Sequence, residues 1–192
     1  MPSTEKAARL VKHVVERLSG RISKTYLAKL VYLCDLHSRE FRGEPITELK
    51  YTWHYYGPWD GSLDRILLDL ATREVIRCEL VQMLDYTGCI FHNGPTKLES
   101  SLSSAERRVA EFVIGKYASR SLRSLLDDVV YQTPPMREAQ RKGSRGARLR
   151  MSQMDNKRAG QYVPFTFDEI AEALEDDSET IDFPSPPIYH PQ

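Results

Sequence analysis

The stretch from Tyr26 to Cys34 is apolar around nearly the whole circumference of a helix. A helix with one apolar stripe packs on one side, whereas a helix that is apolar all round is surrounded by the rest of the fold. The helix turns polar after Cys34 and is expected to stop at Gly43 and Pro45, because glycine accepts a positive φ and proline cannot continue a helix. The chain is therefore predicted to fold around one buried central helix.

An aromatic segment, residues 50–56, follows this helix. Its β-branched and aromatic residues show no helical stripe, so they predict a short strand with Tyr51, Trp53 and Tyr55 on one face. The dipeptide Gly57-Pro58 is expected to end the strand at a tight corner, before another helix begins.

Three motifs in this region resemble those of the Panacea domain family, also called SocA-like or phage-associated domains. They are a helix reading K-L-x-Y-L-x-D, a G-x-P-I turn, and a tryptophan followed by Tyr-Gly-Pro at the start of the next helix. The matching residues are Lys29, Leu30, Tyr32, Leu33 and Asp35, then Gly43, Pro45 and Ile46, then Trp53, Tyr56, Gly57 and Pro58. The resemblance covers residues 8–140.

Membership of that family implies a bacterial or phage protein, commonly the antitoxin of a toxin–antitoxin pair. Such a protein binds a cognate protein toxin and neutralises it, either by blocking it sterically or by holding it for a bacterial protease. The resemblance implies no catalysis and no cofactor. The motif residues Asp35, Gly57 and Pro58 are expected to be structural.

Composition limits the alternatives. Lys and Arg together number 27 and so do Asp and Glu, so no global positive field favours nucleic acid. No apolar run approaches the ~20 residues of a membrane span, and the N-terminus lacks the apolar core of a signal peptide. A cytoplasmic protein without membrane contact is expected. Three cysteines, Cys34, Cys78 and Cys89, are an odd number without framework spacing, and reduced buried thiols are expected.

Apolar periodicity and capping signals predict a mainly α fold. The expectation is a compact domain over residues 1–140, with about five to six helices and a small β-hairpin. The signals are an apolar stripe from Ser3 or Thr4 to Gly20, a cap at Ser23, a stripe over 63–70, a hairpin of 75–84 and 86–92, a capping box at Ser103–Glu106, a stripe over 122–130, and Thr133 followed by two prolines.

The composition changes after residue 140. Residues 141–158 contain seven Lys or Arg and the single acid Asp155, so a flexible basic linker is expected over 141–160. An acidic, proline-containing segment is expected over 161–192, with a short helix that starts at a capping box from Thr166 to Glu169.

Catalytic and metal-binding patterns are weak. No Gly-x-Ser-x-Gly elbow and no phosphate-binding loop occurs in the sequence. Cys34 and His37 lie one helical turn apart, but no second pair completes a metal site, so a packed thiol beside a histidine is expected. We therefore expect neither an enzyme nor a metalloprotein.

Two sets of apolar side chains are candidates for protein binding. One comprises Trp53, Tyr56 and Trp59 at the Gly-Pro corner, because aromatic residues supply large contact area at low entropic cost. For Trp53, packing on the central helix is the favoured interpretation, whereas Tyr56 and Trp59 at the corner suit packing and binding equally. The other set lies in the tail and consists of Phe165, Phe167 and Ile170, which suit docking either in a partner's groove or back on the domain.

Two other functions stay open at this point. A helical pair followed by a hairpin also fits a DNA-binding transcriptional regulator, in which Arg145, Arg148 and Arg150 would contact phosphates. The other is a phage-encoded interaction protein without a toxin.

Overall fold

The structure is a computed structural model that describes residues 2–18, 21–82, 87–98, 102–143, 145–161 and 163. The elements are, in order, α1 (Pro2–Arg17), β1 (Ile22–Ser23), α2 (Lys24–Arg42), β2 (Thr52–His54), β3 (Gly57–Trp59), α3 (Ser62–Thr72), β4 (Ile76–Gln82), β5 (Thr87–Asn93), α4 (Ser104–Tyr117), α5 (Leu122–Ser124), a π-helical turn η1 (Leu125–Val129), a 3₁₀ turn η2 (Val130–Gln132), α6 (Pro134–Lys142) and a 3₁₀ turn η3 (Met151–Met154).

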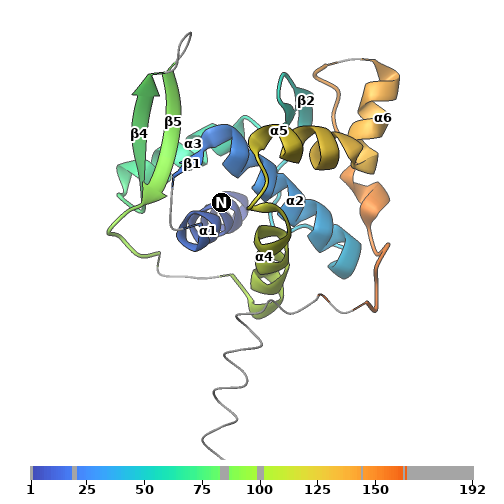
Figure 1. Cartoon of the computed structure of the whole chain (residues 1–192). Coiled ribbons are helices and arrows are strands. Elements are labelled where there is room, and N and C mark those ends of the chain that lie inside the picture. The colour runs from blue at the N-terminus through green and yellow to red at the C-terminus, as the bar shows by residue number, and fades with distance from the viewer. Residues whose placement is uncertain are drawn as a thin grey trace, which may run out of the picture.

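Helix α2 is the centre of the molecule, as predicted. Every residue from Leu27 to Ser38 is buried, and the other elements lie around this helix (Figure 1). The Ser23 hydroxyl caps its first turn by accepting a hydrogen bond from the Tyr26 amide. Gly43 ends the helix in the left-handed conformation, with φ 76°. Both predicted ends are therefore confirmed.

Helix α2 is surrounded by other helices, and this helical layer has a sheet on one side and further short helices on the other. Helices α1 and α4 pack directly on α2, and α3 packs on α1. The sheet that contains β4 and β5 lies at one side of this helical layer, while α5, η1, η2 and α6 lie at the opposite side (Figure 1). The predicted capping box at the start of α4 is present, because Ser103 and Glu106 exchange both hydrogen bonds.

The larger sheet has three strands in the order β1-β5-β4, and all its pairs are antiparallel. The β4–β5 hairpin was predicted from the sequence and is confirmed. Strand β1 was not predicted, because it has only two residues and runs directly into α2. It pairs Ile22 with Phe91 and thereby ties the start of α2 to the sheet.

The prediction for the cysteines is half right. Cys34 is a buried free thiol, as expected. Cys78 and Cys89 were expected to be reduced and buried, but they form a disulfide between β4 and β5. The register places Cys78 opposite Phe91 and Cys89 opposite Leu80, so the two cysteines are diagonal neighbours across the hairpin. The sequence does not fix that register, and the pairing could not be read from it.

A second hairpin, β2–β3, replaces the single strand that was predicted. Trp53 pairs with Pro58 and His54 with Gly57, so Gly57 and Pro58 lie within a strand and do not end one. The expected common face is also wrong: Tyr51 is buried before β2, while Tyr55 lies exposed in the turn. Alternation predicts faces only within one continuous strand, and this strand ends at His54.

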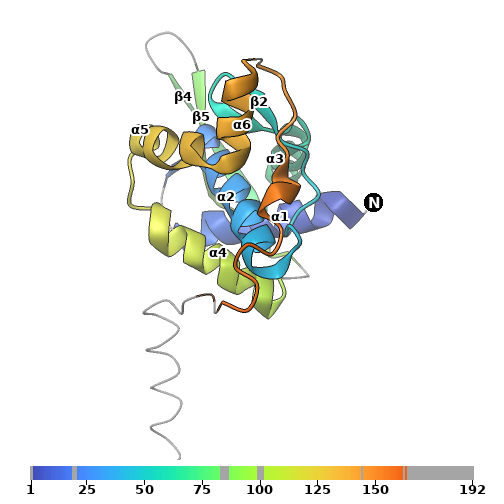
Figure 2. The ribbon, with the colours of Figure 1, turned by 90° about the vertical axis from the view of Figure 1, so that its right-hand side faces the viewer.

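Residues 145–161, here called the strap, return from α6 along β2 and α2 (Figure 2). The Gly146 amide donates to the Trp53 carbonyl at 2.7 Å, and the Leu149 amide donates to the Tyr51 carbonyl at 2.8 Å. Three apolar strap side chains are buried: Leu149, Met151 and Met154. The expected flexible linker is therefore a packed part of the fold, since these three residues anchor a segment that also carries five Lys or Arg residues.

The fold is helix-rich, with six α-helices among the described residues and two small antiparallel sheets. The helical part of the prediction is confirmed, but the strand content was underestimated. The short C-terminal helix expected from the capping box at Thr166 lies outside the described residues. Within the described part of the chain, no helix combines the length and the apolar character that crossing a bilayer requires.

Candidate protein-binding site at the β2–β3 hairpin

The turn of the β2–β3 hairpin carries the most exposed aromatic residues that the structure describes. Tyr55 and Tyr56 are 65% and 66% exposed, and Trp59 on β3 is half-buried beside them. We call these three residues the aromatic tip. Gly57, with φ 87°, directly follows Tyr55 and Tyr56, and a turn that is followed by a left-handed residue is a common connection in hairpins. The turn of the hairpin therefore exposes the side chains of Tyr55 and Tyr56 to solvent.

Lys29 of α2 holds the hairpin from beneath. Its side chain is only 1% exposed, and its Nζ donates a hydrogen bond of 2.7 Å to the carbonyl oxygen of Pro58. Burial disfavours the charged ammonium and lowers the pKa of Lys29 to about 7. A lysine within an otherwise apolar helix thus fastens β3 to the centre of the fold.

The strap holds the hairpin from the side. The backbone of Trp53 is bonded in both directions, because its amide donates to Ala147 at 2.9 Å and its carbonyl accepts from Gly146. The Arg145 guanidinium lies 5.1 Å from the centre of the Tyr55 ring, in a cation–π contact. The hairpin that carries the aromatic tip is therefore held both by Lys29 and by the strap.

A pocket of about 370 Å³ opens next to the tip. Its wall contains Tyr56, Trp59 and Lys29, and the ammonium of Lys24 lies 5.1 Å from the centre of the Trp59 ring. Lys24 is also ion-paired with Asp64, so its charge is balanced. A pocket with aromatic walls and balanced charge suits an apolar or amphipathic side chain of a protein.

Asp35 supports the hairpin from the other end. Its carboxylate accepts hydrogen bonds from the Thr47 amide at 2.7 Å, from the Thr47 hydroxyl at 2.5 Å and from the Tyr51 hydroxyl at 2.7 Å. These bonds tie the loop between α2 and β2 to the central helix. Burial raises the pKa of Asp35 to about 6, although the hydrogen bonds act in the opposite direction. Asp35 thus holds the loop that leads into the hairpin, in which Gly57 and Pro58 are paired with His54 and Trp53.

The structure separates several residues that the sequence grouped together. Arg145 lies at the aromatic tip, whereas Arg148 and Arg150 lie further along the strap, near Asp35. Trp53 is half-buried and its side chain packs against the hydrophobic core, so it contributes less open surface than Tyr55 does. The tail residues Phe165, Phe167 and Ile170 lie outside the described residues.

The side chains of His37 and Cys34 on α2 are both buried within the fold. The two ring nitrogens of His37 contact Glu40 at 2.6 Å and the Tyr117 hydroxyl at 3.0 Å. Burial and the neighbouring Asp35 raise the pKa of Cys34 well above its usual value. Within the described part of the chain, no three His, Cys, Asp or Glu side chains are grouped closely enough to share a metal ion.

Sequence reasoning missed the roles of the two basic residues that support the tip, Lys29 and Arg145. The signal for Lys29 was present, because a lysine inside a helix that is apolar all round must be buried and therefore needs a partner. Arg145 was assigned to phosphate contact since it lies in a basic run, and nothing in that run indicates a return of the chain to Tyr55.

Comparisons with protein-family models, with curated proteins and with solved structures found no match. The resemblance to the Panacea family therefore rests on the three short motifs alone. Those motifs and the geometry of the hairpin are the observations that bear on function.

Proposed function

We propose that this protein is an antitoxin-like binding protein that neutralises a cognate protein toxin by direct contact through the aromatic tip. The observation that carries the proposal is the exposure of Tyr55 and Tyr56 on a turn that Lys29 and the strap already hold in place. Aromatic side chains that are fixed before binding lose little entropy in an interface, and they are frequent among residues that dominate binding energy.

The motif resemblance supplies the class of partner. Lys29, Tyr56, Gly57 and Pro58 belong to the matching motifs, and the same residues form or support the tip. We propose that the toxin is blocked sterically or is held for a bacterial protease, and that binding takes place in the cytoplasm. In this mechanism the protein breaks no bond and uses no cofactor.

The pocket of about 370 Å³ beside the tip gives the interface a place for an anchor residue. Interface energy concentrates where one large side chain fills a desolvated pocket. We propose that an apolar or aromatic side chain of the toxin enters between Tyr56 and Trp59.

The test is co-expression of the chain with each neighbouring reading frame, followed by growth measurement and affinity purification. The expected result is one neighbour that arrests growth alone, permits growth with this protein, and co-purifies with it. Absence of any toxic neighbour would overturn the antitoxin function. A neighbour that binds but is harmless would indicate an interaction protein without a toxin.

A double variant examines the tip itself. Tyr55→Ala combined with Tyr56→Ala should abolish rescue and co-purification, since the tip loses its two exposed rings. The matched control is Leu80→Ala on strand β4, which removes an apolar side chain that is 72% exposed and lies in the other sheet. Thermal unfolding should show both variants folded. Full rescue by the double variant would place the interface elsewhere.

A further inference from the structure

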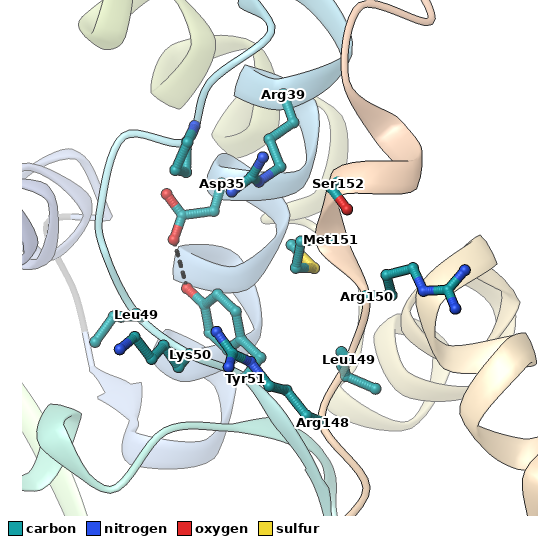
Figure 3. A pocket seen from close by; sticks show the side chains of 11 residues that line it. Asp35, Arg39, Leu49, Lys50, Tyr51, Arg148, Leu149, Arg150, Met151 and Ser152 are labelled. Atoms are coloured by element: carbon teal, nitrogen blue, oxygen red, sulfur yellow. Dashed lines mark hydrogen bonds between the residues drawn. The ribbon is translucent and has the colours of Figure 1, made fainter.

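A second pocket lies on the other side of β2, between α2, the loop that precedes β2, and the strap. Its volume is about 410 Å³, and Figure 3 shows the side chains that line it. The floor contains Asp35 and Tyr51, both buried, and the walls include Leu149 and Met151. The volume falls within the range of ~300–1,000 Å³ that is typical of small-molecule sites.

Cationic side chains outnumber carboxyl groups in the lining. Four of them, Arg39, Lys50, Arg148 and Arg150, accompany the single carboxyl of Asp35. They come from two regions that are far apart in the sequence: α2 with the loop before β2, and the strap. The excess of positive charge is therefore created by the fold and does not reflect one basic run.

The carboxyl groups near the pocket leave part of this charge unbalanced. Asp35 is occupied by its hydrogen bonds from Thr47 and Tyr51, and Asp155 pairs with Arg39 Nη1 at 2.6 Å. Arg150 points away toward α6 (Figure 3), where Glu138 lies 3.8 Å from it. The side chains of Lys50 and Arg148 form no ion pair with any residue that the structure describes.

We infer that this pocket binds a small ligand that carries phosphate groups, either a nucleotide or a free polyphosphate. A guanidinium group binds phosphate through two parallel hydrogen bonds, and an ammonium group adds a point charge. Arg148 and Lys50 supply these groups at the rim, while Arg39 keeps donors other than the Nη1 bonded to Asp155. Beneath them, the Tyr51 ring and the apolar strap residues provide a wall for a planar base.

Binding here would also join parts of the fold. Arg39 belongs to α2, Lys50 to the loop before β2 and Arg148 to the strap, so one ligand contacts all three segments. A ligand that binds only the folded state raises stability by mass action. The inference is independent of the proposed function, because the aromatic tip and this pocket share no lining residue.

Calorimetric titration of the full chain with ADP, pyrophosphate and adenosine tests the inference. Saturable binding of ADP or pyrophosphate is expected, with an increase in the thermal midpoint, and adenosine should bind far more weakly than ADP. Tighter binding of ADP identifies a nucleotide site, and tighter binding of pyrophosphate identifies a polyphosphate site. No saturable binding of either, or adenosine binding equal to that of ADP, would overturn the inference.

Three single substitutions locate the site. Arg148→Gln and Lys50→Gln should each weaken binding by about tenfold, because each removes a charge-assisted contact worth ~1.5 kcal/mol or more. Arg145→Gln is the matched control, since it removes the same charge from the same strap but outside the pocket. All three residues are exposed, so the variants are expected to fold, and thermal unfolding checks this.

Equal weakening by Arg145→Gln would overturn the pocket in favour of nonspecific attraction to the basic strap. Titration with duplex DNA tests the remaining possibility, that the basic strap binds nucleic acid. If DNA binds, pyrophosphate does not, and Arg145, Arg148 and Arg150 contribute equally to DNA binding, then the basic strap contacts nucleic acid and the small-ligand site is excluded.

Discussion

At the scale of single residues, Asp35 shows how a buried charge links structure to pH. Three donor groups surround its carboxyl, and burial nevertheless raises its pKa from 3.8 to about 6. The folded state therefore binds a proton more tightly at this position than the unfolded state does. The resulting stabilisation is fully present below pH 4 and is lost as the pH rises through about 6.

We expect the Asp35→Asn variant to reveal this contribution. The wild-type protein should lose about 2.5 kcal/mol of unfolding free energy relative to the variant between pH 4 and pH 7, because its pKa at this position is raised by about two units. Urea unfolding of both proteins at a series of pH values gives the difference.

The comparison with the variant is needed because other carboxyls act in the opposite direction. The pKa values of Glu106 and Glu111 are lowered, since ion pairs and hydrogen bonds outweigh their burial. Both groups stabilise the fold more as the pH rises, and both are unchanged in the variant. A wild-type-to-variant difference that stays constant from pH 4 to pH 7 would contradict the raised pKa.

At the scale of elements, the β2–β3 hairpin depends on one backbone conformation. Gly57 has φ 87°, a backbone conformation that residues with a side chain rarely adopt. A Cβ at this position would nevertheless have room, because its nearest neighbouring atom would be 3.5 Å away. The conformation alone, and not a steric clash, therefore requires glycine here.

Gly57→Ala is expected to lower the free energy of unfolding by about 1 kcal/mol, because alanine is strained in the left-handed region. The measurement is the urea midpoint at neutral pH. An unchanged midpoint would show that the hairpin turn does not need this conformation.

Gly61→Ala provides the control for the same chemical change. Gly61 has φ −61°, an ordinary conformation for alanine, and a Cβ there would meet no atom within 4 Å. Its unfolding free energy should stay within about 0.5 kcal/mol of the wild type. Similar losses in both variants would point to a general effect of removing glycine.

Elements with strong local signals were predictable from the sequence. The apolar circumference of α2, the capping box before α4 and the β-branched runs of β4 and β5 each carry their own periodicity or cap. Strand β1 and the β2–β3 register carry no such signal, because they exist only through pairing with distant or very short segments. The disulfide between Cys78 and Cys89 depends on that kind of register as well.

At the scale of the whole molecule, the strap completes the fold. Its amides at Asn156 and Arg158 donate to the carbonyls of Arg39 and Glu40 at the end of α2, at 2.9 and 2.8 Å. Carbonyls in the last turn of a helix lack partners within the helix itself, so bonds from outside stabilise it. The strap therefore covers the end of the central helix as well as the side of β2.

Truncation tests this role. A chain that ends at Lys142 should unfold at a much lower urea concentration than one that ends at Val163, or should lose cooperative unfolding. Burial of Leu149, Met151 and Met154 is worth ~1.5–3 kcal/mol for each side chain, against a typical total of ~5–15 kcal/mol. Equal midpoints for the two chains would show that the strap adds nothing to stability.

The candidate sites differ in the same way: one could be predicted from neighbouring residues in the sequence, and the other depends on residues that are distant in the sequence. Trp53, Tyr56 and Trp59 were found from composition and spacing alone. The pocket with Arg39, Lys50 and Arg148 was not, because Arg148 is about a hundred positions from the other two and meets them only through the return of the strap. Its basic character was visible in the sequence, but its packing was not.

The position of the strap has a consequence for synthesis of the protein. A ribosome releases α1 and α2 well before it reaches Leu149, so the nascent domain waits with uncovered apolar surface beside β2. A messenger RNA that is cleaved before this codon yields a product in which the end of α2 and the side of β2 stay uncovered. Chaperones and proteases act on exposed apolar surface. We therefore expect chains with a packed strap to persist and chains that lack the strap to be degraded.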